Sequence, residues 1–128
     1  MTDRSFRMPV ARLAEARGDA AAATYCYEFE WRSPAVRGVL GAVHGLDLLF
    51  AFNNLAEGRK GRLYKNAPDD LAAAMHRAWA DFVRTGDPGW PRYRAPSRPV
   101  MVFDAVRSVA NDPAALPRSL WELASAPS

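Results

Sequence analysis

The sequence contains little cysteine and no long uninterrupted apolar run. Its single cysteine, Cys26, excludes an internal disulfide, and its position between Tyr25 and Tyr27 predicts a small buried hydrophobe. The longest apolar stretch is interrupted by His44 and Asp47, so it is too short to cross a bilayer. The first residues lack the charged-then-apolar pattern of an export signal. We therefore expect a cytoplasmic protein that does not contact a membrane.

Several patterns that carry chemistry are also missing. No serine lies in a Gly-x-Ser-x-Gly nucleophile elbow. The 2 histidines come without a cysteine pair or a His-Glu-x-x-His spacing, and no glycine-rich phosphate loop is present, so we expect neither a metal nor a cofactor. The formal net charge is only +3 and the basic residues are scattered, which argues against nucleic-acid binding.

The length and the apolar content are those of one folded domain. The 128 residues are 49% hydrophobic, which excludes a disordered tail. Periodicity and turn residues then predict the elements. They are, in order, a helix over residues 2–17, a strand over 25–31, a loop over 32–40, a mobile surface loop over 53–67, a helix from Pro68 to Gly86, a strand over 100–103 and a turn or helix over 116–123.

The first helix and the first strand are predicted from their apolar spacing. Phe6, Val10, Leu13 and Ala14 recur at helical spacing, and Pro9 either begins that helix or kinks it. The strand alternates, and its two glutamates place it near the edge of a sheet. The aromatic face of this strand consists of Tyr25, Tyr27, Phe29 and Trp31, opposite Cys26, Glu28 and Glu30.

The second helix is the clearest prediction. Pro68 suits a first turn, and Gly86 followed by Pro88 ends the helix. Its apolar stripe is expected to pack against a sheet rather than to bind a ligand, with His76 on the flank. The stripe consists of Leu71, Met75, Ala78, Trp79, Phe82 and Val83.

The most distinctive stretch surrounds His44. Glycines at positions 41 and 45 flank it, and Leu48, Leu49, Phe50 and Phe52 follow and are expected to anchor it. A histidine in this setting is either a presented base or a core residue whose ring nitrogens are satisfied by the backbone. The residues alone leave both readings open.

The stretch Gly-Ala-Val-His-Gly-Leu-Asp-Leu-Leu-Phe at 41–50 resembles the catalytic-histidine motif of the type B carboxylesterases, which include the cholinesterases. Further blocks resemble this family in the same order, although Asn53 stands where the family usually has glycine and the linker between Gly89 and Trp90 is shorter than usual. These blocks are residues 24–31, Ser33-Pro34, residues 78–88, residues 90–93 and residues 101–104. The resemblance runs from about Thr2 to Trp121.

The resemblance implies an α/β fold: residues 1–128 would be the C-terminal part of an α/β-hydrolase domain, with helices and a few strands of the central sheet, incomplete as a domain. It implies that His44 is the general base of a Ser-His-acid triad. Because the triad order in these folds is serine, acid, histidine, the nucleophile elbow and the acid are expected upstream, and the chain is expected to be inactive alone. Asp47 and Glu28 could each orient a histidine, but Asp47 is better explained as a structural acceptor for the loop.

Two other functions stay open from the sequence. The chain could be a non-enzymatic truncated module that pairs with another chain, or a hydrolase whose own serine reaches His44, with Ser33 nearest in sequence. The expected partners are a small-molecule ester in the complete enzyme and either the missing N-terminal half or a second copy of the chain.

Overall fold

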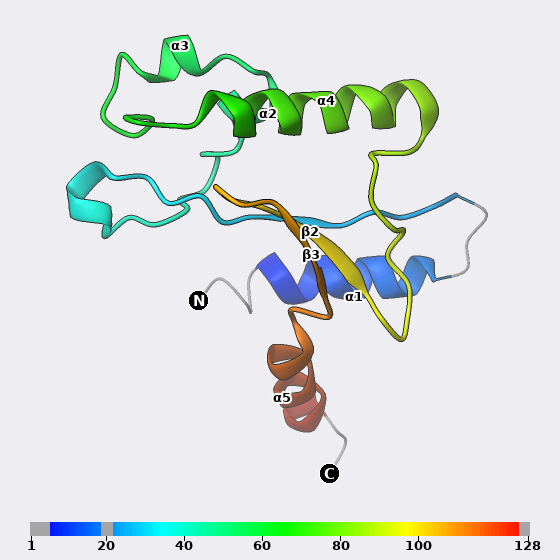
Figure 1. The fold of residues 1–128 in the computed structure, drawn as a ribbon. Coiled ribbons are helices and arrows are strands. Elements are labelled where there is room, and N and C mark those ends of the chain that lie inside the picture. The colour runs from blue at the N-terminus through cyan, green and yellow to red at the C-terminus, as the bar shows by residue number, and fades with distance from the viewer. Residues whose placement is uncertain (1–5, 19–21, 126–128) are drawn as a thin grey trace. The chain divides into compact units, whose positions relative to one another are not determined.

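The computed structural model describes the backbone of residues 6–18 and 22–125, and the side chains of that part up to Leu120. The described chain forms two compact units. One contains the residues up to Cys26 together with Pro91–Val100 and the residues from Val109 onward. The other contains Tyr27–Trp90 and Met101–Ser108. Figure 1 shows the elements along the chain.

The second unit is built around a parallel strand pair joined through a helix. Strand β1 (Tyr27–Phe29) pairs in parallel with β2 (Pro99–Phe103), with Tyr27 opposite Met101 and Phe29 opposite Phe103. Between them lie the turn η2 (Ala35–Gly38), the short helices α2 (Leu48–Ala51) and α3 (Leu55–Gly58), and the long helix α4 (Asp69–Thr85). Parallel neighbours need such a crossover, so the predicted α/β class is confirmed.

The sheet order is β1, β2, β3, with β3 formed by Ser108–Asn111. Within the described chain, β1 therefore lies at the edge of the sheet, as its two glutamates predicted. The strand is shorter than the predicted span of 25–31, although the Glu30 amide still donates to the Phe103 carbonyl at 2.9 Å. The sequence did not predict β3, because three of its four residues are exposed and carry no apolar alternation.

Helix α4 begins and ends where its sequence signals predict. Pro68 occupies the N-cap in an extended conformation, and Gly86 ends the helix at φ 79°, a left-handed conformation that glycine adopts without a Cβ clash. The predicted stripe is buried only in its first half, through Leu71 and Met75. Further along the helix, Ala78 packs against the core and Trp79 meets Tyr27 edge to face. The predicted stripe was wrong at its end, where Val83 is 81% exposed.

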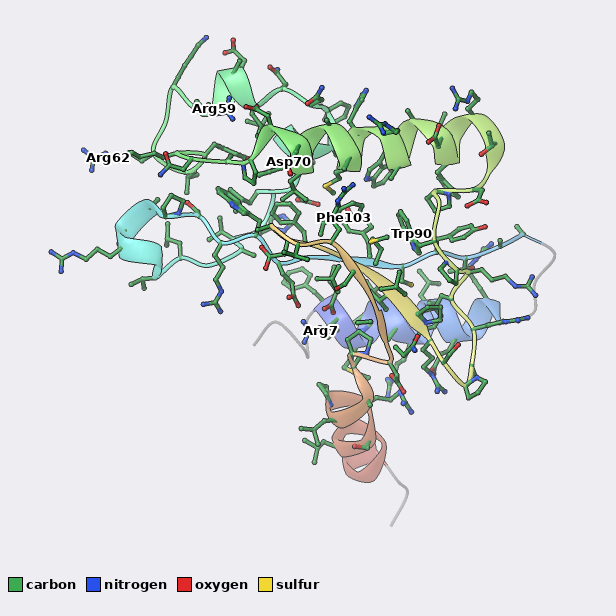
Figure 2. The ribbon with its side chains drawn as sticks, in the orientation of Figure 1. Arg7, Arg59, Arg62, Asp70, Trp90 and Phe103 are labelled. Carbon is green, nitrogen blue, oxygen red and sulfur yellow. The ribbon has the colours of Figure 1, made fainter. Side chains whose placement is uncertain are left out.

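The core of this unit surrounds Phe50, whose side chain is completely buried. Its ring centroid lies 4.9 Å from Phe29, 5.2 Å from Trp31 and 6.2 Å from Tyr64. Figure 2 shows Trp90 beside Phe103 at the edge of this core, where the two rings meet edge to face at 5.8 Å. The buried members of the core are Trp31, Leu46, Phe50, Leu55, Ala67, Leu71, Ala72, Met75 and Phe103.

Residues 53–67 were predicted to be a mobile surface loop without regular structure, and the absence of regular structure was wrong. The segment contains α3, and Leu55 and Ala67 are both 3% exposed within the core. Arg59 fixes the end of this segment by donating to the Ala67 carbonyl at 2.6 Å and to Asp69 at 2.8 Å. A four-residue helix is too short to leave a period in the sequence.

In the first unit, α1 (Met8–Arg17) has Pro9 in its first turn, so the proline begins the helix rather than kinking it. The predicted stripe is largely wrong here: Leu13 is 65% exposed, and the buried face consists of Met8, Ala11 and Ala14. Small side chains let neighbouring segments approach, and Ala14 packs with Tyr93, Val100 and Cys26. The predicted residues 2–5 of this helix lie outside the described residues.

Polar groups also hold the first unit together. Arg98 donates to Glu15 at 2.7 Å, and Arg118 pairs with Asp112. Arg118 belongs to α5 (Ala115–Ser125), which extends the predicted helix of 116–123 by one residue at its start and two at its end. Hydrogen bonding to Glu15 raises the pKa of Arg98 above its usual range. Ion pairs of this kind fix α1 and α5 to the segments around β2 and β3 within the unit.

Candidate functional site

His44 lies in an exposed turn between β1 and α2. Residues 44–47 form the turn, and the imidazole-bearing residue is exposed. The Leu46 amide donates to the Val43 carbonyl at 3.1 Å, and the Leu48 amide donates to Gly45 at 3.3 Å. Gly45 has φ 78°, which explains the glycine after the histidine. The turn therefore presents His44 at the surface of the second unit.

The turn is anchored by two residues four positions apart. Leu46 is 2% exposed and Phe50 is fully buried, so both sides of the Asp47 position are fixed in the core. The predicted anchors were only partly right, because Leu48 is 55% and Phe52 73% exposed. The chain becomes helical at α2, so only the residues on one helical face, four positions apart, are buried. Leu48 and Phe52 lie outside this face. Asn53, where the resembling family usually has glycine, has φ 50°, a conformation that asparagine tolerates better than most residues.

Asp47 is held by a tyrosine from β1. The Tyr27 hydroxyl donates to Asp47 Oδ2 at 3.1 Å, across 20 residues of sequence. Burial, together with the nearby Asp47 carboxylate, raises the pKa of Tyr27 to about 12, so the hydroxyl keeps its proton at ordinary pH. Burial and then Asp47 also raise the pKa of Tyr64. Asp47 thus acts as the structural acceptor that the sequence favoured, and Tyr27 is the partner that the sequence did not reveal.

Glu28, the other acid considered for orienting a histidine, lies in the middle of β1. Its backbone is in register with Val102 of β2, and its side chain is half-buried. Asp47 belongs to the histidine turn itself, whereas Glu28 belongs to β1.

Ser33 is not available as a nucleophile in this structure. Its side chain is 0% exposed. Its hydroxyl donates to the Leu63 carbonyl at 2.6 Å and accepts from the Ala35 amide at 3.2 Å. The hydroxyl proton and a lone pair are both engaged, as in a serine that closes a loop. The alternative of a Ser33 hydrolase therefore has no geometric support.

The second histidine and the remaining candidates are structural. His76 is exposed on the flank of α4, as expected, with Nδ1 2.9 Å from the Ala51 carbonyl at the end of α2. Cys26 is half-buried, and burial raises the pKa of its thiol to about 11. Among the residues that the structure describes, no group of three or more His, Cys, Asp or Glu is arranged to hold a metal ion. In the same part of the chain, no helix is both long and apolar enough to cross a membrane.

Comparison with known proteins finds relatives and structures that are named as hydrolases and esterases. A phenmedipham hydrolase of Pseudarthrobacter oxydans is 37% identical over 97 residues, which cover 67% of this chain and 20% of that protein. A carboxylesterase structure from Geobacillus stearothermophilus aligns with a TM-score of 0.74 and 35% identity, over 94% of this chain and 26% of the other. An esterase structure from Clostridium hathewayi aligns with a TM-score of 0.78 and 27% identity, over 93% and 25% of the two chains.

The chain thus spans about a quarter or less of the length of these relatives. The structural neighbours are carboxylesterases of the α/β-hydrolase type. The sequence model described as "Carboxylesterase family" matches residues 1–115. On this match, together with the shared fold, the chain belongs to the carboxylesterase family.

Proposed function

We propose that this chain contributes the general base, His44, of a carboxylic-ester hydrolase with a Ser-His-acid triad. The observation that carries the proposal is the exposed turn of His44, anchored from below by Leu46 and Phe50 in a carboxylesterase-like fold. A general base must reach a nucleophile outside its own loop, and an exposed imidazole on a fixed turn satisfies that requirement.

The chemistry follows from the role of such a base. The imidazole accepts the proton of a serine hydroxyl as that oxygen attacks the ester carbonyl, and it returns the proton to the departing alcohol. In the second half of the cycle the imidazole takes a proton from water as the water oxygen attacks the acyl-serine carbonyl. It then returns that proton to the serine oxygen as the bond to the acyl group breaks, which releases the acid and regenerates the serine. The substrate class that we propose is a small-molecule carboxylic ester.

The serine and the acid would come from the part of the domain that this chain does not span. Among the serines of the described chain, the one nearest His44 in sequence, Ser33, is fully buried and hydrogen-bonded. Asp47 is engaged by Tyr27. We therefore propose that residues 1–128 are the C-terminal segment of a carboxylesterase domain and that the partner supplying the other two triad members is the upstream part of such a domain.

The test is complementation. The chain is co-expressed with the remaining, serine-bearing part of a family esterase, and hydrolysis of p-nitrophenyl acetate is measured. The chain alone should give no turnover above background, because loss of triad members costs roughly four or more powers of ten in rate. The complemented pair should be active, and His44→Ala should abolish that activity.

His76→Ala is the matched control, because His76 is also exposed but contacts the Ala51 carbonyl on the flank of α4. It should leave the activity of the complemented pair unchanged. Activity that survives His44→Ala, or that is lost equally in both variants, would contradict the assignment of His44 as the base.

A further inference from the structure

Tyr27 connects the histidine turn to three other elements of its unit. Its ring meets Trp79 of α4 edge to face at a centroid distance of 6.0 Å and Phe103 of β2 at 5.7 Å. Its backbone lies in β1, opposite Met101. From this fixed position the hydroxyl reaches Asp47 Oδ2. Ring contacts and strand pairing therefore restrict the position of the Tyr27 hydroxyl.

Asp47 in turn joins the histidine turn to α2. It occupies the N-cap position of α2, and its carbonyl accepts from the Ala51 amide at 2.9 Å. Its carboxylate makes no side-chain hydrogen bond to cap that helix. An aspartate in this position commonly caps the first turn of the helix, but the Asp47 carboxylate accepts from the Tyr27 hydroxyl instead.

The hydrogen bond between Tyr27 and Asp47 acts on His44 through the short hydrogen-bonded turn that contains both Asp47 and His44. His44 is exposed and its backbone belongs to the turn, so a change in the conformation of the turn moves the imidazole. Two backbone bonds, from Leu46 to Val43 and from Leu48 to Gly45, keep residues 43–48 in one conformation. The Tyr27–Asp47 bond is charge-assisted, because a neutral hydroxyl donates to a carboxylate, and its length of 3.1 Å is above the range of about 2.5–2.7 Å of the strongest bonds of this kind. Loss of that bond would free the turn next to the histidine.

We propose that Tyr27 is a positioning residue for His44, because its hydroxyl fixes Asp47 and thereby the turn that presents the imidazole. The inference rests on the proposed function for its catalytic meaning, but the effect on the turn can be measured in this chain alone. Tyr27 acts through Asp47 and touches no reacting atom.

The primary experiment is amide hydrogen exchange by NMR on the full chain. Tyr27→Phe keeps the ring contacts and removes only the hydroxyl. The Leu46 and Leu48 amides should then exchange about tenfold faster, the effect expected from losing one charge-assisted bond. The amide of Met75, in the buried part of α4, should keep its rate, because a local opening does not unfold the core.

Two controls separate positioning from general destabilisation. Tyr93→Phe also removes the hydroxyl of a buried tyrosine, in the cluster with Ala14 and Val100 rather than beside Asp47, and should leave the turn amides unchanged. In an Asp47→Ala background, Tyr27→Phe should add nothing further, because the two residues act through one bond. Equal rates in Tyr27→Phe and the unmodified chain, acceleration that includes Met75, or additive effects in the double variant would each overturn the proposal.

Asp47→Asn provides a second route if Tyr27→Phe does not fold. It keeps an oxygen acceptor but removes the charge, so the turn amides should exchange about threefold faster, and an unchanged rate would overturn the proposal. In the complemented enzyme, Tyr27→Phe should lower kcat about tenfold with KM unchanged. If His44→Ala retains activity while the exchange result holds, the catalytic role fails and the positioning of the turn stands.

Discussion

The hydroxyl of Ser33 offers a direct test of how the loop before His44 is held. The side chain is 0% exposed and makes two hydrogen bonds, one to the Leu63 carbonyl at 2.6 Å and one from the Ala35 amide at 3.2 Å. Each such bond contributes about 1 kcal/mol net. Ser33→Ala should therefore lower the free energy of unfolding by about 2 kcal/mol.

The assay is urea unfolding followed by tryptophan fluorescence, since Trp31 lies in the same core. With a urea m-value of about 2 kcal/mol per molar, the midpoint should fall by about 1 M. Ser97→Ala is the matched control, because Ser97 is exposed, and it should change stability by less than about 0.5 kcal/mol.

The same variant tests the alternative nucleophile. The unmodified chain should not react with a fluorophosphonate probe, because the Ser33 proton is donated to Leu63 and the side chain is inaccessible. A loss of stability no larger than that of Ser97→Ala, or labelling that disappears in Ser33→Ala, would refute the reasoning and restore Ser33 as a candidate nucleophile.

Three further outcomes follow from the structure. Gly58→Ala should destabilise the chain by about 1–3 kcal/mol in urea unfolding, because its Cβ would lie 2.6 Å from the Tyr64 ring as well as 2.5 Å from the Leu49 side chain. Gly61→Ala, with a nearest atom at 3.5 Å, should be tolerated. Burial raises the pKa of Cys26 from 9.0 to about 11, so the contribution of the neutral thiol to stability is fully present below pH 9 and is lost as the pH rises toward 11. Cys26→Ala should therefore show a smaller fall in melting temperature over this pH range than the unmodified chain. The exposed end of α4 should bind a hydrophobic dye, and Val83→Ser, at a side chain that is 81% exposed, should reduce the fluorescence; an unchanged signal would contradict this.

The sequence by itself determined the elements whose signals are local. Pro68 and Gly86 set the two ends of α4 because one suits a helix N-terminus and the other adopts the left-handed conformation at its end. The α/β class followed from the resemblance of the histidine motif and the blocks around it to the carboxylesterase family. The glycine-flanked motif identified His44, and the family that it resembles is the one to which the chain belongs.

Other features were decided by tertiary structure. The stripes of α1 and α4 predicted burial of residues such as Leu13 and Val83, but burial depends on which surfaces another element covers, and periodicity carries no such information. In the same way, the sequence showed Ser33 as a serine near His44, and only the fold brought it against Leu63, 30 residues away.

The hydrogen bond between Tyr27 and Asp47 shows the same limit within the site. Each residue was visible in its own motif, one as an aromatic strand residue and the other as an acid three positions after the histidine. Their contact spans 20 residues and exists because β1, α4 and the start of α2 pack around one core. The sequence therefore determined which residue is presented, and the packing of distant segments decided what holds it in place.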